Sequence, residues 1–446
     1  MDLPQPYLRL NLLIGLFSLP EELLQKFKSK SSLALLGRDH KDLNFYLPKS
    51  FVWFNRNQSR EECMQELNDF FKEFKAGSNE WIIKRDGTSR GLGVHLLHDV
   101  ETIQELQLRK DFGILHKKPG VAQKYIERPL LLPSNAFVSQ AKTGYKWDFR
   151  IYGLIVGVNT DSPSYSCYLY EDGFARRCSE AYMPIQSLSG KECKENALKA
   201  HLTNTYINNR SDSSSINEMS KDMGTLQSKE RNTGYEECQA GEEKAGRKGE
   251  SDLPITMSME TLWEKLLESY PKDKVTCAKI EIERMLKILF QSILFESPEK
   301  TNADYAKQFQ LLGIDVILDS DFKPWILEVN HFPDMRCYTM EQFEVKQRLL
   351  TDTIGLLFGR NAEKIVDSAS MDAELLRLNS FRKGLSELPR TVAGEQQPSP
   401  TNAPTKFPNS SPTKEIASEG VMSPYKSKWK LIHDSSSLYK AGPREP

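Results

Sequence analysis

The stretch that decides the fold is GIDVILDSDFKPWILEVN, residues 313–330. Its two apolar runs flank a polar segment, 319–323, that is typical of a tight turn. We therefore predict two antiparallel strands joined by this turn. Such pairing would bring Asp315 and Glu328 side by side. Asn330 would share the face of Glu328, because alternate residues of a strand point to the same side.

This arrangement of side chains suggests a metal site. Two carboxylates and an amide oxygen that converge from rigid strands suit Mg²⁺, a hard cation that prefers oxygen ligands. The residues that flank the carboxylates are apolar, so the negative charges are costly unless a cation lies between them. Asp315, Glu328 and Asn330 are therefore candidate magnesium ligands. The alternative is a set of acidic side chains on an exposed sheet.

A second informative stretch is WIIKRDGTSRGLGV, residues 81–94. A buried strand presents Lys84, a loop with three glycines follows, and another strand begins. Glycines let backbone N–H groups approach phosphate oxygens closely, and a fixed lysine supplies the opposite charge. The stretch is neither a Walker loop nor a Rossmann fingerprint. A phosphate-binding loop and a plain glycine-rich hairpin are both compatible with it.

The third stretch is KWDFRIYGLIVGV, residues 146–158, which follows VAQKYI at 121–126. Its alternation places Lys146, Asp148 and Arg150 on one face of a strand, with two aromatic residues on the other. A charged row of this kind is too polar for a hydrophobic core. It either forms a solvated outer face or lines a site.

Composition separates an apolar core from polar segments. The chain has 446 residues, about three domains' worth at roughly 150 residues each, but only 39% of them are hydrophobic. Residues 209–254 are rich in Ser, Glu, Lys, Gly and Asn, and the chain from about 389 is rich in Pro, Ser, Thr and Lys. We interpret the first as a disordered insertion and the second as a disordered tail. The tail's basic KSKWK segment, 426–430, is then a solvated stretch.

Charge and cysteine usage exclude several classes of protein. Lys and Arg number 60 against 61 Asp and Glu, for a net charge of −1, which disfavours a globally basic binder of nucleic acid or of an anionic membrane. The longest apolar run, 10–19, is too short to span a membrane and lacks the basic start of a secretory signal. The seven cysteines form no CxxC pair, so we expect reduced thiols. We predict a soluble, cytoplasmic monomer.

Taken together, the motifs resemble the tubulin tyrosine ligase-like family, most of all its polyglutamylases. The resemblance covers about residues 33–360 and rests on WIIKRDGTSRGLGV, VAQKYIERPLLL, KWDFRIYGLI, EDGFARRCSEAY, HLTN and FQLLGIDVILDSDFKPWILEVN, in this order. It implies an α/β (α+β) ATP-grasp fold, in which the nucleotide lies between two sheet-containing lobes. The expected parts are a short or divergent N-terminal part (1–76), a central ATP-grasp region (77–208), the insertion (209–254), a C-terminal ATP-grasp region with the magnesium site (255–388) and the tail (389–446).

The resemblance also implies roles for the matching positions. Lys84 and Lys146 would hold the phosphates of ATP, with Arg90 and Gly91 in the loop over them. The remaining nucleotide contacts would come from a hinge beside the adenine (Gln123, Lys124, Tyr125, Ile126) and from Asp148, Thr203 and Asn204. Asp315, Glu328 and Asn330 would bind Mg²⁺. Arg150 and Arg176 are the candidate catalytic residues that steady an acyl phosphate, and Arg176 and Lys346 are candidates for binding the incoming amino acid.

The implied activity is ATP-dependent addition of free L-glutamate to glutamate side chains of tubulin C-terminal tails, through an acyl phosphate. EVNH at 328–331 and SRGLG at 89–93 favour the polyglutamylases over the tyrosine ligase itself. Tubulin or microtubules would be the partner, in the cytoplasm and cytoskeleton, with the cilium or basal body as a further expected location. Three alternatives are a tyrosine or glycine ligase, a catalytically silent microtubule-binding relative, and an ATP-grasp ligase for a small molecule.

The sequence departs from the family pattern at three places. Leu92 stands where Arg or Lys is usual, and Thr205-Tyr206 follows HLTN where an aromatic residue usually comes first. Phe332-Pro-Asp334 replaces a small residue, Pro and Ser. The last two departures would touch the amino-acid or acceptor pocket, so they bear on substrate choice more than on ATP binding.

Overall fold

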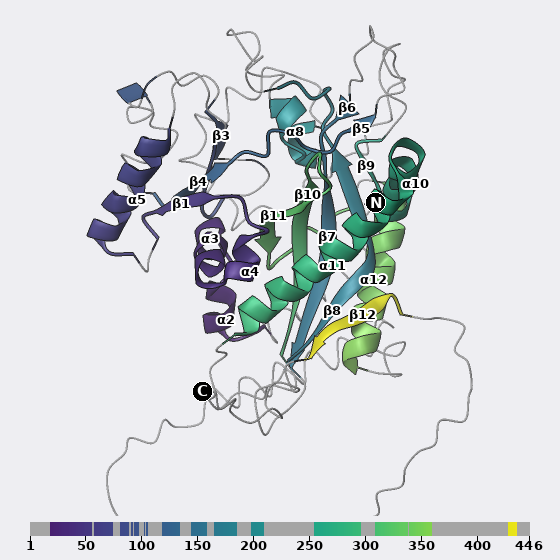
Figure 1. Cartoon of the computed structure of the whole chain (residues 1–446). Helices are drawn as coiled ribbons and strands as arrows, with labels where there is room; N and C mark the ends of the chain where they lie inside the picture. The colour runs from purple at the N-terminus through teal and green to yellow at the C-terminus, as the bar shows by residue number, and fades with distance from the viewer. Residues whose placement is uncertain are drawn as a thin grey trace, which may run out of the picture. The chain divides into compact units, whose positions relative to one another are not determined.

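Two antiparallel sheets and the helices around them make up most of the described chain (Figure 1). The computed structural model describes residues 18–55, 58–74, 81–88, 91, 93–97, 102, 104–105, 118–133, 144–157, 165–184, 198–208, 254–295, 308–337, 339–358 and 427–434. The chain divides into two units, residues 1–353 with 428–446, and residues 354–427. Of the second unit, the structure describes residues 354–358, which end a helix, and Ser427.

The strand pair predicted at 313–330 lies in the larger sheet. Strands β10 (Phe309–Leu318) and β11 (Pro324–Asn330) pair antiparallel, with Asp315 opposite Glu328 and Gly313 opposite Asn330. This confirms the predicted pairing. On its other side β10 pairs with β7 (Trp147–Gly157), and β7 pairs with β8 (Tyr165–Arg177). The strand order is β11-β10-β7-β8-β12, and the short strand β9 (Thr256–Ser258) also pairs with β8.

The smaller sheet has the order β1-β4-β2-β3. Its strands are β1 (Ser50–Trp53), β2 (Trp81–Arg85), β3 (Val94–Leu96) and β4 (Gly120–Lys124). Strand β1 hydrogen-bonds to β4. Residues 50–53, which were expected in the N-terminal part (1–76), therefore belong to the same sheet as strands of the expected central region (77–208). A further two-stranded sheet joins β5 (Leu132–Pro133) to β6 (Gly144–Tyr145).

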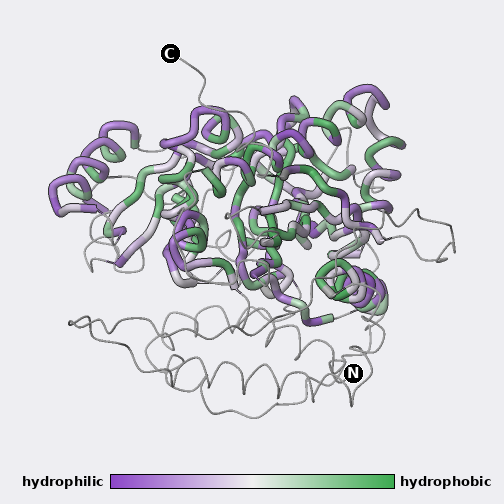
Figure 2. The backbone as a smooth tube through the Cα atoms, turned by 90° about the horizontal axis from the view of Figure 1, so that it is seen from below, coloured by the Kyte–Doolittle hydropathy of each residue, from purple (hydrophilic) through white to green (hydrophobic). Residues whose placement is uncertain are grey.

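Helix α5 (Arg60–Glu73) covers the smaller sheet and begins at a capping box, in which Ser59 and Glu62 bond to each other's backbone N–H. Its residues Cys63, Leu67 and Phe70 recur at helical spacing and are buried in a cluster with strands β1, β2 and β4. Hydrophilic and hydrophobic positions alternate along this helix, at the left of Figure 2.

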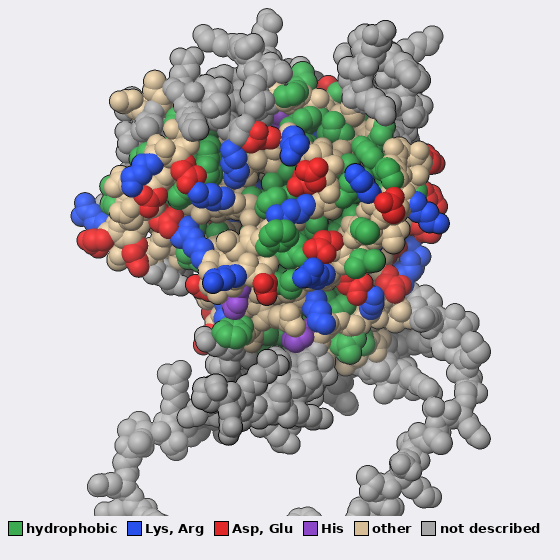
Figure 3. Space-filling view, in the orientation of Figure 1, with side chains coloured by type: hydrophobic (Ala, Val, Ile, Leu, Met, Phe, Trp, Pro, Cys, Tyr) green, Lys and Arg blue, Asp and Glu red, His purple; other side chains and the backbone are tan. Residues whose placement is uncertain are grey.

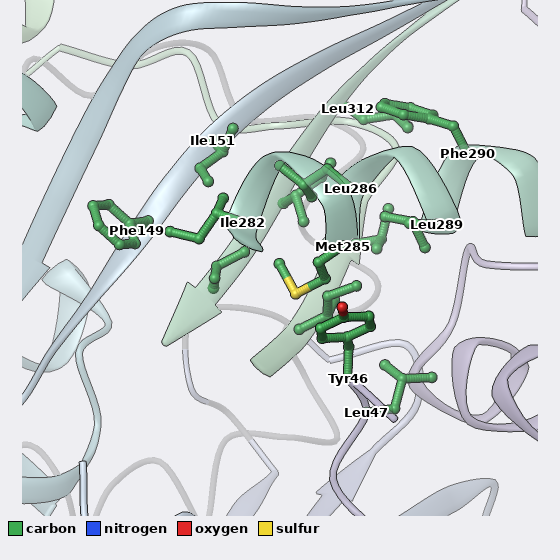
Figure 4. Packing of buried hydrophobic residues seen from close by; sticks show 14 of the residues in the cluster. Tyr46, Leu47, Phe149, Ile151, Ile282, Met285, Leu286, Leu289, Phe290 and Leu312 are labelled. Carbon is green, nitrogen blue, oxygen red and sulfur yellow. The ribbon is translucent and has the colours of Figure 1, made fainter. Parts of the chain in front are cut away.

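The remaining described helices are α2 (Glu21–Gln25), α3 (Lys30–Asp39), α4 (Lys41–Asn44), α8 (Thr205–Asn208), α10 (Met259–Ser269), α11 (Lys272–Leu294) and α12 (Met340–Phe358). The longest, α11, runs across the larger sheet (Figure 1). In the main core, Ile282 of this helix faces Phe149 of β7, Phe290 lies beside Leu312 of β10, and Met285 lies beside Tyr46 (Figure 4). Each fully buried side chain of this size contributes roughly 1.5–3 kcal/mol. Within the described ranges, no helix has the length and apolarity needed to cross a membrane.

The prediction of a disordered tail over 389–446 is wrong for its strand β12 (Trp429–Asp434), which pairs antiparallel with β8. The short run Trp429–Ile432 carries three large apolar residues that a composition averaged over the whole tail conceals. The proposed insertion at 209–254, apart from Pro254, lies outside the described residues, and so does a helix suggested by the pattern at 372–388.

Candidate active site

A cavity of about 920 Å³ is lined by strands of both sheets, by the loops 201–205 and 330–336, and by α12. Of the residues predicted for the site, all that the structure describes line this cavity. Arg90 lies outside the described residues. The residues brought together are Lys84, Gly91, Gln123, Lys124, Tyr125, Ile126, Lys146, Asp148, Arg150, Arg176, Thr203, Asn204, Asp315, Glu328, Asn330 and Lys346.

Lys84 lies at the end of the cavity formed by the smaller sheet. Its Nζ donates a hydrogen bond of 2.6 Å to Oε1 of Gln123 on the neighbouring strand β4. Burial lowers the pKa of Lys84 to about 8 because the charged form loses its hydration. The amide of Gln123 offers a dipole but no countercharge.

Lys146, just before β7, has a similar environment. Its Nζ donates to the hydroxyl of Tyr125 at 2.7 Å and to the carbonyl of His201 at 2.9 Å, and lies 4.2 Å from the centre of the Tyr125 ring. Burial lowers the pKa of Lys146 to about 8 as well. The wall beside it is apolar, since Ile82, Tyr125 and Leu202 belong to one buried cluster.

The glycine-rich loop joins β2 to β3, and its backbone explains its composition. Gly87, Gly91 and Gly93 have φ values of 69°, 79° and 66°, a region that other residues enter only with strain. A Cβ at Gly91 would also lie 2.5 Å from Cδ1 of Ile207 on α8. The loop is therefore a glycine hairpin that also reaches the cavity, through Thr88 and Gly91.

The larger sheet places a network of ion pairs on the opposite wall. The β register sets Asp148 across from Arg176, and Arg150 across from Asp315. Arg150 Nε donates to Asp315 Oδ1 at 2.6 Å, and Arg176 binds Asp148 through two bonds of 2.8 and 2.6 Å. Arg176 also reaches Asp315 at 3.0 Å, and Thr203 donates to Asp148 at 2.5 Å.

This network shows where the charged row on β7 lies. Lys146 and Asp148 are buried and line the cavity together with Arg150, so the alternative of a solvated outer face is wrong. Burial alone would raise the pKa of Asp315, but the guanidinium groups of Arg150 and Arg176 outweigh it and lower that pKa. Asp315 is therefore ionised at neutral pH, and it links the two arginines.

The predicted magnesium ligands adjoin the same network. Asp315 and Glu328 are cross-strand neighbours, and Glu328 Oε1 lies 3.5 Å from Nζ of Lys30 on α3. The donor chemistry fits Mg²⁺, because all three predicted ligands offer hard oxygens. Among the described residues, no group of three His, Cys, Asp or Glu side chains is placed to hold a metal. The site therefore depends on the amide of Asn330, and a cation would share Asp315 with its arginines.

Lys346 of α12 lies at the far end of the cavity. Its Nζ donates to the backbone carbonyl of Arg336, and burial lowers the pKa of Lys346 to about 8. The loop before α12 also lines this end with Phe332, Asp334 and Arg336. Arg336 binds Asp334 through its Nε at 3.0 Å. The departure noted at 332–334 thus lies on the cavity wall.

Sequence reasoning missed two charged residues of the cavity, Lys30 and Arg336. Nothing in the sequence near Lys30 links it to the site, because α3 reaches the cavity only through the tertiary fold. Its Nζ donates to the carbonyl of Thr88 in the glycine-rich loop. Arg336 could have been found, since it lies two residues after the departure at 332–334, which was expected to touch the amino-acid or acceptor pocket.

Comparison with known proteins shows which family the chain belongs to. Residues 22–248 and 247–364 match the tubulin-tyrosine ligase family. The chain is 24% identical over 364 residues to tubulin monoglutamylase TTLL4 of Mus musculus (75% of this chain, 25% of that protein). It is 26% identical over 365 residues to tubulin polyglutamylase ttll6 of Danio rerio (80% and 38%), and 23% identical over 367 residues to a probable beta-tubulin polyglutamylase of Tetrahymena thermophila (79% and 24%).

The chain has a mixed α/β fold with antiparallel sheets, and lysines and arginine–carboxylate pairs line its cavity. The family match covers more than half of the chain, and the chain therefore belongs to the tubulin-tyrosine ligase family. This confirms the resemblance seen in the motifs. The chain spans about a quarter to two fifths of the length of these three curated relatives.

Proposed function

We propose that this protein is an ATP-dependent ligase with an ATP-grasp fold that adds glutamate to glutamate side chains of tubulin C-terminal tails. One observation carries the proposal. Lys84, Lys146 and Lys346 line one cavity, where Lys146 and Lys346 are buried and Lys84 is partly buried. Each donates its hydrogen bonds to uncharged groups, and desolvation lowers the pKa of each to about 8. A buried ammonium with uncharged partners gains most from an anionic ligand.

The positions of these lysines divide the cavity between two ligands. Lys84 and Lys146 would bind the phosphates of ATP, and the apolar wall of Ile82, Tyr125 and Leu202 would hold the adenine. Lys346, at the other end, would bind the carboxylate of the incoming amino acid. The hinge of Gln123, Lys124, Tyr125 and Ile126 borders the adenine end, with Asp148, Thr203 and Asn204 beside it.

Mg²⁺ would be held by Asp315, Glu328 and Asn330, where it would neutralise charge on the phosphates. When bound, ATP supplies a phosphoryl group that turns the acceptor carboxylate into an acyl phosphate with a good leaving group. Arg150 and Arg176 are fixed beside Asp315, and their guanidinium groups would stabilise the negative charge that develops on the acyl phosphate. The amine of free L-glutamate then forms the amide bond as phosphate leaves.

Glutamate is favoured over tyrosine or glycine by one fact. The three relatives named above are called glutamylases or polyglutamylases. Arg150, Arg336 and Lys346 line the cavity. The two arginines are already paired with Asp315 and Asp334, so Lys346, whose Nζ donates to a carbonyl, is the cation that a carboxylate of the amino acid would meet. We propose the cytoplasm and cytoskeleton, including the cilium, as the location of this activity.

The test is mass spectrometry of tubulin tails after incubation with the full chain, ATP, Mg²⁺ and equal amounts of Glu, Gly and Tyr. We expect mass increments of glutamate that disappear in Glu328→Gln. Increments of glycine or tyrosine would correct the amino acid, and no increment of any kind would contradict ligase activity on tubulin. Unchanged incorporation by Glu328→Gln would contradict the metal assignment.

A further inference from the structure

The segment that leads into strand β12 contacts α12, the helix that carries Lys346. It pairs with β8 at the edge of the larger sheet, as the yellow strand of Figure 1 shows. Trp429 of β12 lies edge-on to Tyr170 of β8, with ring centres 4.9 Å apart. Strand β8 pairs with β7 along one edge. Along its other edge it pairs with β12 and then with β9.

Lys428, the residue before β12, is bound through its backbone and its side chain. Its N–H donates to Asp352 of α12 at 3.0 Å, and its carbonyl accepts from the N–H of Glu171 on β8. Its ammonium lies 3.3 Å from Asp172, also on β8. A single residue of the C-terminal segment thus joins α12 to the sheet.

The two carboxylates that Lys428 meets are both buried. Asp352 is 3% exposed and accepts a second hydrogen bond from the hydroxyl of Tyr170 at 2.9 Å. Asp172 is 6% exposed and also pairs with Arg348 of α12 at 3.4 Å. Buried carboxylates are costly unless they are hydrogen-bonded or paired, so both depend in part on Lys428.

Helix α12 connects this contact to the cavity. Asp352 lies six residues after Lys346 on the helix, about 9 Å along its axis. Glu341, near the start of α12, accepts from the N–H of Ser258 on β9 at 2.8 Å. The helix is therefore tied to the sheet edge on both sides of Lys346, by β9 before it and by Lys428 after it.

We propose that Lys428 and β12 position α12 so that Lys346 stays against the carbonyl of Arg336 in the cavity. Lys428 is then a positioning residue for the amino-acid end of the site, although it does not line the cavity. The role assigned to Lys346 rests on the function proposed above, whereas the coupling between Lys428 and α12 does not.

The chain offers a matched control for a test of this coupling. Lys430 lies on the same strand two residues later and pairs with Glu283 of α11 at 2.8 Å, not with α12. The variants are Lys428→Ala, the conservative Lys428→Arg, Lys428→Glu and the control Lys430→Ala. Lys428→Glu sets a carboxylate against Asp172 and is expected to have the largest effect.

Two measurements on the full chain are independent of ligase activity. One is hydrogen exchange of the α12 amides, with α10 as the internal reference. The other is the rate of reductive methylation of Lys346, followed by mass spectrometry. Lys428→Ala keeps the backbone bond to Asp352 and removes the ammonium from Asp172, the carboxylate that Arg348 of α12 also binds. Through this shared carboxylate we expect both rates to rise about two- to fivefold, the range for losing one partly exposed ion pair. Lys428→Arg should restore both rates, and Lys430→Ala should change neither.

The KM of the ligase reaction tests the link to the site. Lys428→Ala should raise the KM for the amino acid while leaving the KM for ATP within twofold, a split that general destabilisation would not produce. Unchanged exchange in α12 of both Lys428→Ala and Lys428→Glu would overturn the proposal. Faster exchange without a change in Lys346 methylation would also overturn it. A wild-type chain without ligase activity would count against the proposed function alone, because exchange and methylation still decide the coupling.

Discussion

The cationic side chains on the two walls of the cavity have opposite environments. On one side, Lys84 of the smaller sheet and Lys146, which precedes β7 but reaches toward Tyr125 just after β4, donate to uncharged oxygens, and burial lowers the pKa of each to about 8. On the larger sheet, Arg150 and Arg176 are held by Asp315 and Asp148, and the carboxylates raise the pKa of each guanidinium despite its burial. Within the part of the chain that the structure describes, the lysines of the first wall have no hydrogen bond to a carboxylate, so we call this wall electrostatically incomplete. The arginines of the second wall are paired with carboxylates of the same sheet.

This difference separates ligand binding from structural support. The arginines are fixed by cross-strand register and two-point bonds, so their geometry exists before any ligand arrives. The lysines donate their hydrogen bonds to uncharged groups, and the nearby carboxylates of Asp148, Asp315 and Glu328 do not offset the effect of burial on their pKa values. A ligand that brings negative charge would compensate more of their charge. Lysine and carboxylate substitutions should therefore have different consequences. On the surface shown in Figure 3, by contrast, Lys and Arg are interspersed with Asp and Glu.

The largest expected effect is on stability, from Asp315→Asn. This change leaves two buried guanidinium groups without their shared carboxylate, and breaking a buried pair in this way costs about 3–5 kcal/mol. Urea unfolding of the purified variant measures this loss. Asp321→Asn is the control, because Asp321 is 72% exposed and pairs with Arg128 at 3.4 Å in the β10–β11 turn. Equal stability of the two variants would show that the network is not structural.

Next in size is the loss of activity expected from Lys84→Met. We expect kcat/KM for ATP to fall about 10²–10³-fold, as for the loss of one preorganised charge contact. Stability at pH 7 should stay the same or rise, because a costly buried charge is removed. Lys49→Met is the control, since Lys49 is 58% exposed and pairs with Glu73 outside the cavity. A large fall in the stability of Lys84→Met without a fall in its activity would show that Lys84 supports the structure and does not bind the ligand.

The same variant also has a predicted pH dependence. The pKa of Lys84 is about 8 in the folded protein, against 10.5 for an exposed lysine. Between pH 8 and 10.5 the unfolded lysine holds its proton while the folded one has lost it, so this lysine makes stability rise with pH. The stability difference between wild type and Lys84→Met should therefore shift in favour of wild type over this range. A difference that is constant with pH would exclude a lowered pKa.

A third effect, of intermediate size, concerns the glycine-rich loop. Gly91→Ala and Gly87→Ala share the cost of a positive φ, but a Cβ at Gly91 would also lie 2.5 Å from Ile207, whereas a Cβ at Gly87 would meet nothing within 4 Å. We expect Gly91→Ala to cost about 1–3 kcal/mol more in thermal unfolding and to raise the KM for ATP. Identical KM values in the two variants would mean that the loop does not contact the nucleotide.

The sequence predicted those parts of the fold that short-range patterns determine. The alternation of β7, the apolar stripe of α5 and the turn between β10 and β11 each follow from local spacing, so Asp315 and Glu328 could be paired in advance. The candidate residues in the motifs also converge on one cavity. Local pattern was enough for the residues that lie on a strand or beside one. Thr203 and Asn204, just before α8, and Lys346 on α12 were assigned through the family resemblance.

The sequence could not show how distant segments meet. Asp148 and Asp315 were assigned to nucleotide and metal, and the ion pairs that join both to Arg176 depend on the order of β8, β7 and β10 in the sheet. Lys30 enters from α3 with no motif of its own. Strand β12 was hidden in a polar segment, because six residues with three large apolar side chains hardly change the composition of a 58-residue tail.

The smallest expected effect tests whether the two walls are linked. Lys30 donates to Thr88 in the glycine-rich loop of the smaller sheet and lies 3.5 Å from Glu328 of the larger one. Lys30→Gln can keep the bond to Thr88 while losing the ion pair, which is worth at most about fivefold in an equilibrium constant. We expect a KM for ATP raised within this limit and unchanged unfolding. A change as large as that of Lys84→Met would mean that Lys30 itself binds the phosphates, which would place a third lysine on the incomplete wall.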